Sequence, residues 1–117
     1  MILKTEILNW VYVKTPKVIA ETIVDKKENV NIRDVATTWT DFALEVVQDD
    51  IIEDWIINLC WSKMESINKD LMKILDPTEL YVLWRFFDKI IKKIEEECLA
   101  AECYEGLHNL KKLKELF

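Results

Sequence analysis

The chain has 117 residues, of which 50% are hydrophobic and 32% charged, and its formal net charge is −6. This length fits one domain, and this composition is typical of a globular protein rather than of a disordered chain. The sequence holds one glycine, Gly106, and two prolines, Pro16 and Pro77. Phosphate-binding loops and dinucleotide fingerprints need clustered glycines, so the composition excludes both kinds of nucleotide site.

Charge and hydropathy also bear on partners and location. The residues between Arg33 and Lys63 include seven acids and no base, which opposes binding to the phosphates of a nucleic acid. No stretch reaches the roughly 18 apolar residues that a membrane helix requires, and no basic leader precedes a long apolar run. We therefore predict a cytoplasmic protein that binds neither nucleic acid nor a membrane.

Apolar residues recur at helical spacing along nearly the whole chain. The predicted helices cover residues 2–13, 16–27, 32–47, 51–61, 77–104 and 107–117, and a short helical piece is expected at residues 71–75. The pattern shows no internal repeat and no low-complexity tract. We predict an all-α fold, a single compact bundle of five to six helices that forms one helical domain over residues 1–117.

Three of these helices share one start signal, a short polar residue followed three positions later by an acid. The three signals are Asn31-x-x-Asp34, Asp50-x-x-Glu53 and Asp76-Pro77-Thr78-Glu79. The polar side chain accepts hydrogen bonds from free backbone N–H groups, and the acid complements the helix dipole. Gly106 is expected just beyond the end of the 77–104 helix, where a left-handed backbone is usual.

Some apolar residues lie outside the core-facing stripes and predict an interface. In the segment 51–61, eight of eleven residues are apolar, so this helix is either central in the bundle or part of an oligomer contact. Ile57 and Trp61 fall on its polar side, and Val82 and Phe86 lie off the stripe of the 77–104 helix. We therefore predict a homodimer, or a complex with another protein, whose interface includes these four residues.

The sequence offers few groups for transition-metal or nucleophilic chemistry. His108 is the one histidine, and Gly106 interrupts the Glu105-x-x-His108 pair that could otherwise offer two ligands. Cys98 and Cys103, five apart on one predicted helix, point in different directions and lie beyond the reach of a disulfide. We predict reduced thiols, no bound metal and no cofactor, and a protein that is more readily a binding module than an enzyme.

Two alternative functions stay open. Asp25-x-x-Glu28 and Asp50-x-x-Glu53 are similar to the paired acidic motifs of the all-α nucleotide pyrophosphohydrolases, a resemblance that implies an Mg²⁺-dependent enzyme with these four residues as its metal ligands. That family prefers glutamate where this chain has aspartate.

The second alternative is a groove that receives a partner's amphipathic helix. Trp55-Ile56 followed by Trp61 is partly similar to a segment of helical apoptosis regulators. The two glycines of that segment are missing, so membership of that family is not inferred.

Overall fold

The computed structural model describes residues 4–17, 20, 31–48 and 50–117, and within them it contains five helices and no strand. The helices are α1 (Lys4–Lys14), α3 (Ile32–Val46), α4 (Asp54–Met72), α5 (Pro77–Ala100) and α6 (Tyr104–Lys114). The predicted all-α bundle is therefore confirmed. Most of the helix predicted for residues 16–27 lies outside the described residues.

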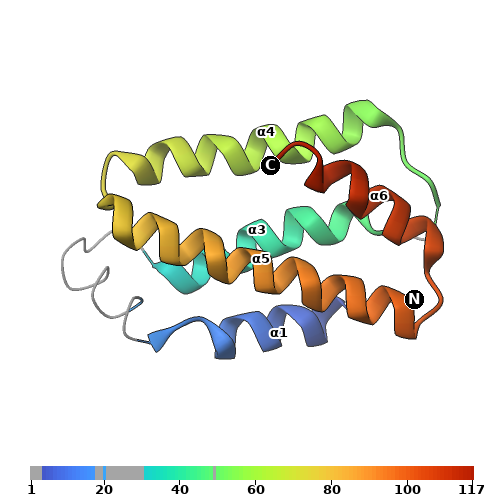
Figure 1. The fold of residues 1–117 in the computed structure, drawn as a ribbon, viewed down its shortest axis with the longest axis horizontal. Coiled ribbons are helices and arrows are strands. Elements are labelled where there is room, and N and C mark those ends of the chain that lie inside the picture. Colours follow the sequence, from blue (N-terminus) through green and yellow to red (C-terminus); the bar gives the residue numbers. More distant parts are fainter. Residues whose placement is uncertain (1–3, 18–19, 21–30, 49) are drawn as a thin grey trace.

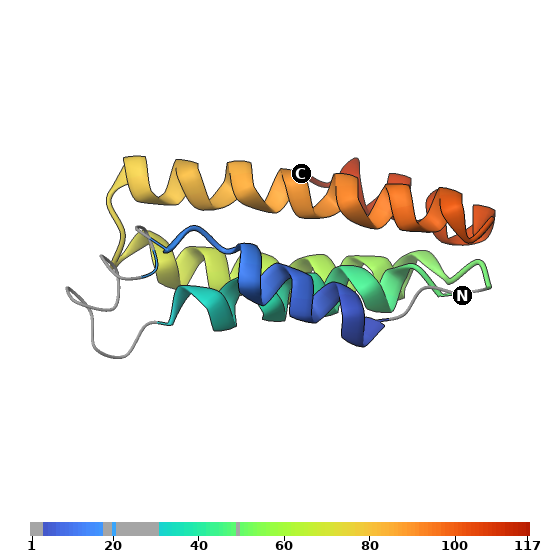
Figure 2. The same ribbon diagram turned by 90° about the horizontal axis from the view of Figure 1, so that it is seen from below.

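The helices pack in two layers, with α5 and α6 in one and α1, α3 and α4 in the other (Figure 2). Helix α3 contacts each of the other four described helices, so it is the central element of the bundle. Helix α6 turns back from the end of α5 and packs against α3, α4 and α5 (Figure 1). This arrangement corrects the alternative that made the 51–61 segment central. None of the described helices is long and apolar enough to cross a membrane.

The core follows from the amphipathic pattern of α3. Its inward stripe includes Ile32, Ala36, Trp39 and Ala43, all of which are fully or almost fully buried. The Trp39 ring stacks on Trp84 of α5 with 4.8 Å between ring centroids. The hydrophobic stripe that predicted this helix is therefore the face that meets α5.

Two of the three predicted start signals act as expected. The Asn31 side chain accepts hydrogen bonds from the backbone N–H groups of Arg33 and Asp34, at 3.0 and 3.3 Å. At α5, the Asp76 carboxylate accepts from the Glu79 N–H at 2.9 Å, and the Glu79 side chain accepts from the Asp76 N–H. This reciprocal pair is a capping box, so local side chains fix where α5 begins.

Removing the α5 cap should have a measurable cost. We expect Asp76→Ala to lower the free energy of unfolding by about 1 kcal/mol, because it leaves the Glu79 N–H without its carboxylate acceptor. Urea denaturation followed by circular dichroism measures the change. Thr78→Ala, an exposed substitution in the same turn, is the control and should shift stability by less than about 0.5 kcal/mol. Equal effects of the two substitutions would contradict the capping assignment.

The third start signal is wrong. Helix α4 begins at Asp54 instead of residue 51, and its N-cap residue Glu53 makes no side-chain capping hydrogen bond. The helix then continues without a break to Met72, through residues 62–70 where the sequence predicts none. The Asp50 signal fails because the connection before α4 is held by a side chain from another helix, described below.

The end of α5 also differs from the prediction. The helix stops at Ala100, and Glu102 takes the left-handed conformation, with φ of 55°, that was expected of Gly106. Gly106 lies inside α6 instead. A Cβ on Gly106 would lie 2.8 Å from the Cys103 Sγ, so glycine is needed here for close packing and not for a turn.

Candidate interaction surface

The four residues predicted to form an interface do not share one exposed surface. Ile57 is 3% exposed and Phe86 is 9% exposed, so both are buried within the single chain. The interpretation that these two lie off the core-facing side is therefore wrong. Ile57 is covered because the C-terminal end of α6 lies over it, where Lys112 and Leu116 line a small cavity with it.

Phe86 belongs to the buried core that α5 shares with the other helices. On the same flank of α5, two turns after Phe86, the Lys93 ammonium lies 5.5 Å from the centroid of the Trp10 ring on α1. Helix α1 therefore approaches a side of α5 that its hydrophobic stripe alone leaves open. The sequence could not show this, since α1 is weakly amphipathic and gives no sign of where it packs.

Trp61 and Val82 retain exposed area but differ in their surroundings. Trp61 is half-buried, and its ring packs against Phe117 at the C-terminus with 5.1 Å between centroids. Phe117 also contacts the rings of Trp84 and Phe87 on α5. Trp61 thus has an aromatic partner within the chain, whereas Val82 is exposed on α5. These two residues stay candidates for a contact surface.

A clearer surface is the outward side of α4. Trp55 and Leu59 are 61% and 46% exposed, and they lie one turn apart on the same side of the helix. Ser62 and Ser66 continue the same line at heptad-like spacing and are also exposed. We name Trp55, Leu59, Ser62 and Ser66 the α4 outer stripe. It carries no charge, and its two large members are held away from the core.

The ends of the α4 outer stripe differ in charge. Asp50, Glu53 and Asp54 precede or begin the helix, and Lys69 and Lys73 come at its far end, all exposed. The Glu53 carboxylate accepts a hydrogen bond from the Trp55 indole N–H, which fixes one orientation of that ring. The stripe is therefore apolar near an acidic end and small and polar toward an end of mixed charge, where Asp70 is exposed between Lys69 and Lys73.

A groove between α3 and α4 is another candidate binding surface. It encloses about 370 Å³, with an apolar lining from Val35, Ile67, Leu71 and Ile74. Asp34 and Asp70 add carboxylates to the lining. This volume suits a small ligand or one or two side chains, which is less than the four anchors that a docked amphipathic helix usually inserts.

Only two of the four residues of the possible magnesium site lie within the described part of the chain. Asp25 and Glu28 lie outside the described residues, and Asp50 and Glu53 are exposed in the connection between α3 and α4. Within residues 4–17, 20, 31–48 and 50–117, no group of three or more His, Cys, Asp or Glu side chains could hold a metal ion. The pyrophosphohydrolase alternative therefore stays a prediction.

The Glu105 and His108 pair is also placed differently from the prediction. Gly106 does not interrupt it, because both residues lie on the continuous helix α6. Both side chains are exposed, one turn apart on the surface. The reason for the difference is the early end of α5, which lets α6 begin at Tyr104.

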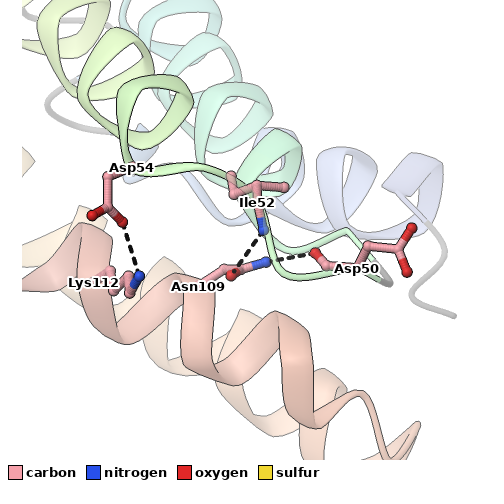
Figure 3. Close-up of polar contacts among 5 residues, drawn as sticks. All are labelled: Asp50, Ile52, Asp54, Asn109 and Lys112. Atoms are coloured by element: carbon pink, nitrogen blue, oxygen red, sulfur yellow. Dashed lines mark hydrogen bonds and ion pairs between the residues drawn. The ribbon is translucent and has the colours of Figure 1, made fainter.

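Sequence reasoning missed Asn109, which fixes the connection before α4 (Figure 3). Its amide group donates to the Asp50 carbonyl oxygen at 3.0 Å, and its carbonyl oxygen accepts from the Ile52 N–H at 3.4 Å. Asn109 is fully buried, so these bonds lie away from water. The available signal was its position next to Leu110 on the inward side of a helix, where an amide needs partners.

Asp54 and Lys112 make a second link between α4 and α6 (Figure 3). The Lys112 ammonium lies 2.8 Å from the Asp54 carboxylate oxygen. The hydrogen bond from Lys112 and then its charge hold the pKa of Asp54 below its usual value. The pair is exposed, so its role is to orient the start of α4 rather than to add much stability.

Comparison of the chain with protein-family models, with curated proteins and with solved structures finds no match in any of the three.

Proposed function

We propose that this protein is a non-catalytic protein–protein interaction module that self-associates through the α4 outer stripe. The observation that carries the proposal is the exposure of Trp55 and Leu59, two large apolar side chains one turn apart, on a helix whose other side packs on α3. Tryptophan is enriched at the centres of protein interfaces, where it contributes much of the binding energy.

The charges around α4 favour a second copy of the same chain as the partner. Two α4 helices that cross antiparallel about a twofold axis place the acidic start of each near Lys69 and Lys73 of the other. Ser62 and Ser66 lie near the crossing point, and their small side chains let the two helices approach closely. Such a contact is self-complementary, as a twofold interface requires.

This surface replaces most of the one that the sequence predicts. Ile57 and Phe86 are buried in the single chain and have little area left for a partner. Trp61 lies six residues after Trp55 and therefore on a different side of α4. Val82 lies on α5, so a substitution of Val82 tests the interface that the sequence predicts without altering the α4 outer stripe.

The interface should be sensitive to a charge at Leu59. We expect sedimentation equilibrium to show a dimer that forms reversibly in the micromolar range. We expect Leu59→Glu to raise the dimer dissociation constant at least about tenfold, because it removes an apolar side chain from the contact and brings a carboxylate into it. Val82→Glu is the matched control and should leave the dissociation constant nearly unchanged.

Three outcomes would contradict the proposal. A wild-type chain that stays monomeric at several hundred micromolar has no such interface. Equal weakening by the two substitutions indicates a general effect of charge, and weakening by Val82→Glu alone places the contact on α5. Circular dichroism of each variant verifies that Leu59→Glu, at an exposed position, leaves the fold intact.

A further inference from the structure

The turn between α5 and α6 brings two cysteines together. After Ala100 the chain reverses in a Schellman motif, in which the Glu102 N–H donates to the Leu99 carbonyl at 3.1 Å and the Cys103 N–H donates to the Cys98 carbonyl at 2.8 Å. In this motif the side chains of the first and last residues characteristically touch. Here those residues are Cys98 and Cys103.

The backbone spacing suits a disulfide. A hydrogen bond of 2.8 Å from the Cys103 nitrogen to the Cys98 oxygen, with standard bond lengths, keeps the two Cα atoms within about 6 to 7 Å of each other. Disulfides span Cα separations of roughly 4.4 to 6.8 Å. The sequence prediction that these thiols point apart is therefore wrong, because it assumed that α5 continued through Cys103.

The two sulfur atoms also share one space. The position that a Cβ on Gly106 would occupy lies 2.8 Å from the Cys103 Sγ and 3.6 Å from the Cys98 Sγ. Val47, just after α3, borders the same point at 3.5 Å. The missing side chain of Gly106 thus leaves room for both sulfurs where α5, α6 and the end of α3 meet.

We propose that Cys98 and Cys103 are a reversible dithiol–disulfide pair that closes by exchange with a low-molecular-weight disulfide such as glutathione disulfide. In the first step the Cys103 thiolate attacks one sulfur of that disulfide, forms a mixed disulfide and releases one glutathione thiolate. In the second step the Cys98 thiolate attacks the Cys103 sulfur and releases the other glutathione. Two electrons pass from the protein to the small disulfide, and the two thiol protons go to the released thiolates.

Exposure sets the order of the two steps. Cys103 is partly exposed, whereas Cys98 is fully buried and out of reach of an external disulfide. Burial, and then the charge and hydrogen bond of the nearby Cys103 thiol, raise the pKa of Cys98 to about 12. Cys98 is therefore mostly protonated at neutral pH, so ring closure is expected to be the slower step.

The test uses the whole chain in mixtures of glutathione and glutathione disulfide. As the mixture becomes more oxidising, the chain should lose two hydrogens in mass, and its reactive thiols in denaturant should fall from three to one. Digestion after glutamate cuts the chain at Glu102, between the two cysteines. The two resulting peptides should stay joined until a reductant is added.

Variants assign the bond and measure its effect. Cys60→Ser, which alters the third cysteine, should leave the mass loss unchanged, whereas Cys98→Ala should instead trap one glutathione on Cys103. The bond closes a short loop and so lowers the conformational entropy of the unfolded chain, and the native turn already holds the two cysteines close together. We therefore expect oxidation to raise Tm by about 5 °C. Three free thiols under all conditions, a stable glutathione adduct on the wild-type chain, or a bond to Cys60 or to a second chain would each overturn the proposal. Peptide mapping of the wild-type chain decides the question even if a variant fails to fold.

Discussion

Replacing Asn109 by alanine is expected to lower the free energy of unfolding by about 2 to 3 kcal/mol. The substitution removes both the donor to the Asp50 carbonyl and the acceptor of the Ile52 N–H, at a side chain that is fully buried. Each buried backbone group that loses its partner costs on the order of 1 to 3 kcal/mol, which exceeds the small gain in helix propensity from alanine. Urea denaturation monitored by circular dichroism measures the loss.

Asn58→Ala provides the control for this experiment. Asn58 is exposed on α4, so its replacement should change stability by less than about 0.5 kcal/mol. Asn109→Asp is the more stringent variant. It keeps an oxygen for the Ile52 N–H but turns a charge toward the Asp50 carbonyl, and it should destabilise at least as much as alanine. A cost below about 0.5 kcal/mol for Asn109→Ala would show that the amide does not hold this connection.

Asn109 also explains why the start of α4 could not be predicted from its own sequence. Asp50-x-x-Glu53 carries the residues of a helix start, and the apolar residues after Asp50 continue the pattern. The hydrogen bonds that keep residues 50–53 out of the helix come from a side chain more than fifty positions later. Capping at Asn31 and Asp76 was predictable because every participating group lies within one turn.

The end of α5 was missed for a different reason. A left-handed residue after a helix is usually glycine, and the one glycine of the chain lies only four positions after Glu102. The chain instead uses Glu102 for the turn and keeps Gly106 for the close packing of α6 against Cys103. A close approach between two helices is a tertiary property, so the sequence pattern assigned the glycine to the wrong task.

The error in the predicted end of α5 also led to the wrong prediction for Cys98 and Cys103. If Cys103 lay on the same helix as Cys98, the two thiols would point in different directions and lie too far apart for a disulfide. The turn at Glu102 brings the two thiols together, so the dithiol pair depends on the backbone conformation of this one residue. The cysteine spacing was visible in the sequence, but its meaning required the boundary of α5.

The α4 outer stripe shows another limit of periodicity. A helix that is apolar on nearly all sides is usually buried on nearly all sides, and this reasoning identified the segment as either central or an interface. The structure leaves Trp55 and Leu59 exposed and buries Ile57. Hydrophobicity could predict surplus apolar area on this helix but could not predict which side a partner would contact, because the packing of α6 determines which side is covered.

Replacing Trp39 by alanine should have the largest effect of any single substitution considered, a loss of about 3 to 5 kcal/mol. Trp39 is fully buried at the centre of α3, stacked on Trp84 and edge-on to Phe87 at 5.3 Å between centroids. Alanine would leave a cavity between α3 and α5, and the cost of this cavity adds to the lost burial of the indole ring. Far-UV circular dichroism in urea is the suitable measurement because it does not depend on tryptophan fluorescence.

Phenylalanine separates the packing of Trp39 from its polarity. The Trp39 indole nitrogen is buried without a hydrogen-bond partner in the described part of the chain, whereas the Trp84 nitrogen donates to the Asn68 carbonyl oxygen at 2.9 Å. Trp39→Phe therefore removes an unsatisfied N–H, which offsets much of the lost ring volume, and should cost less than about 1.5 kcal/mol. Trp84→Phe removes a hydrogen bond as well as ring volume. Relative to the area that each side chain buries, Trp84→Phe should therefore cost more than Trp39→Phe. A cost of Trp39→Phe close to that of Trp39→Ala would mean that the indole nitrogen has an acceptor and that this part of the core is held by polarity as well as by packing.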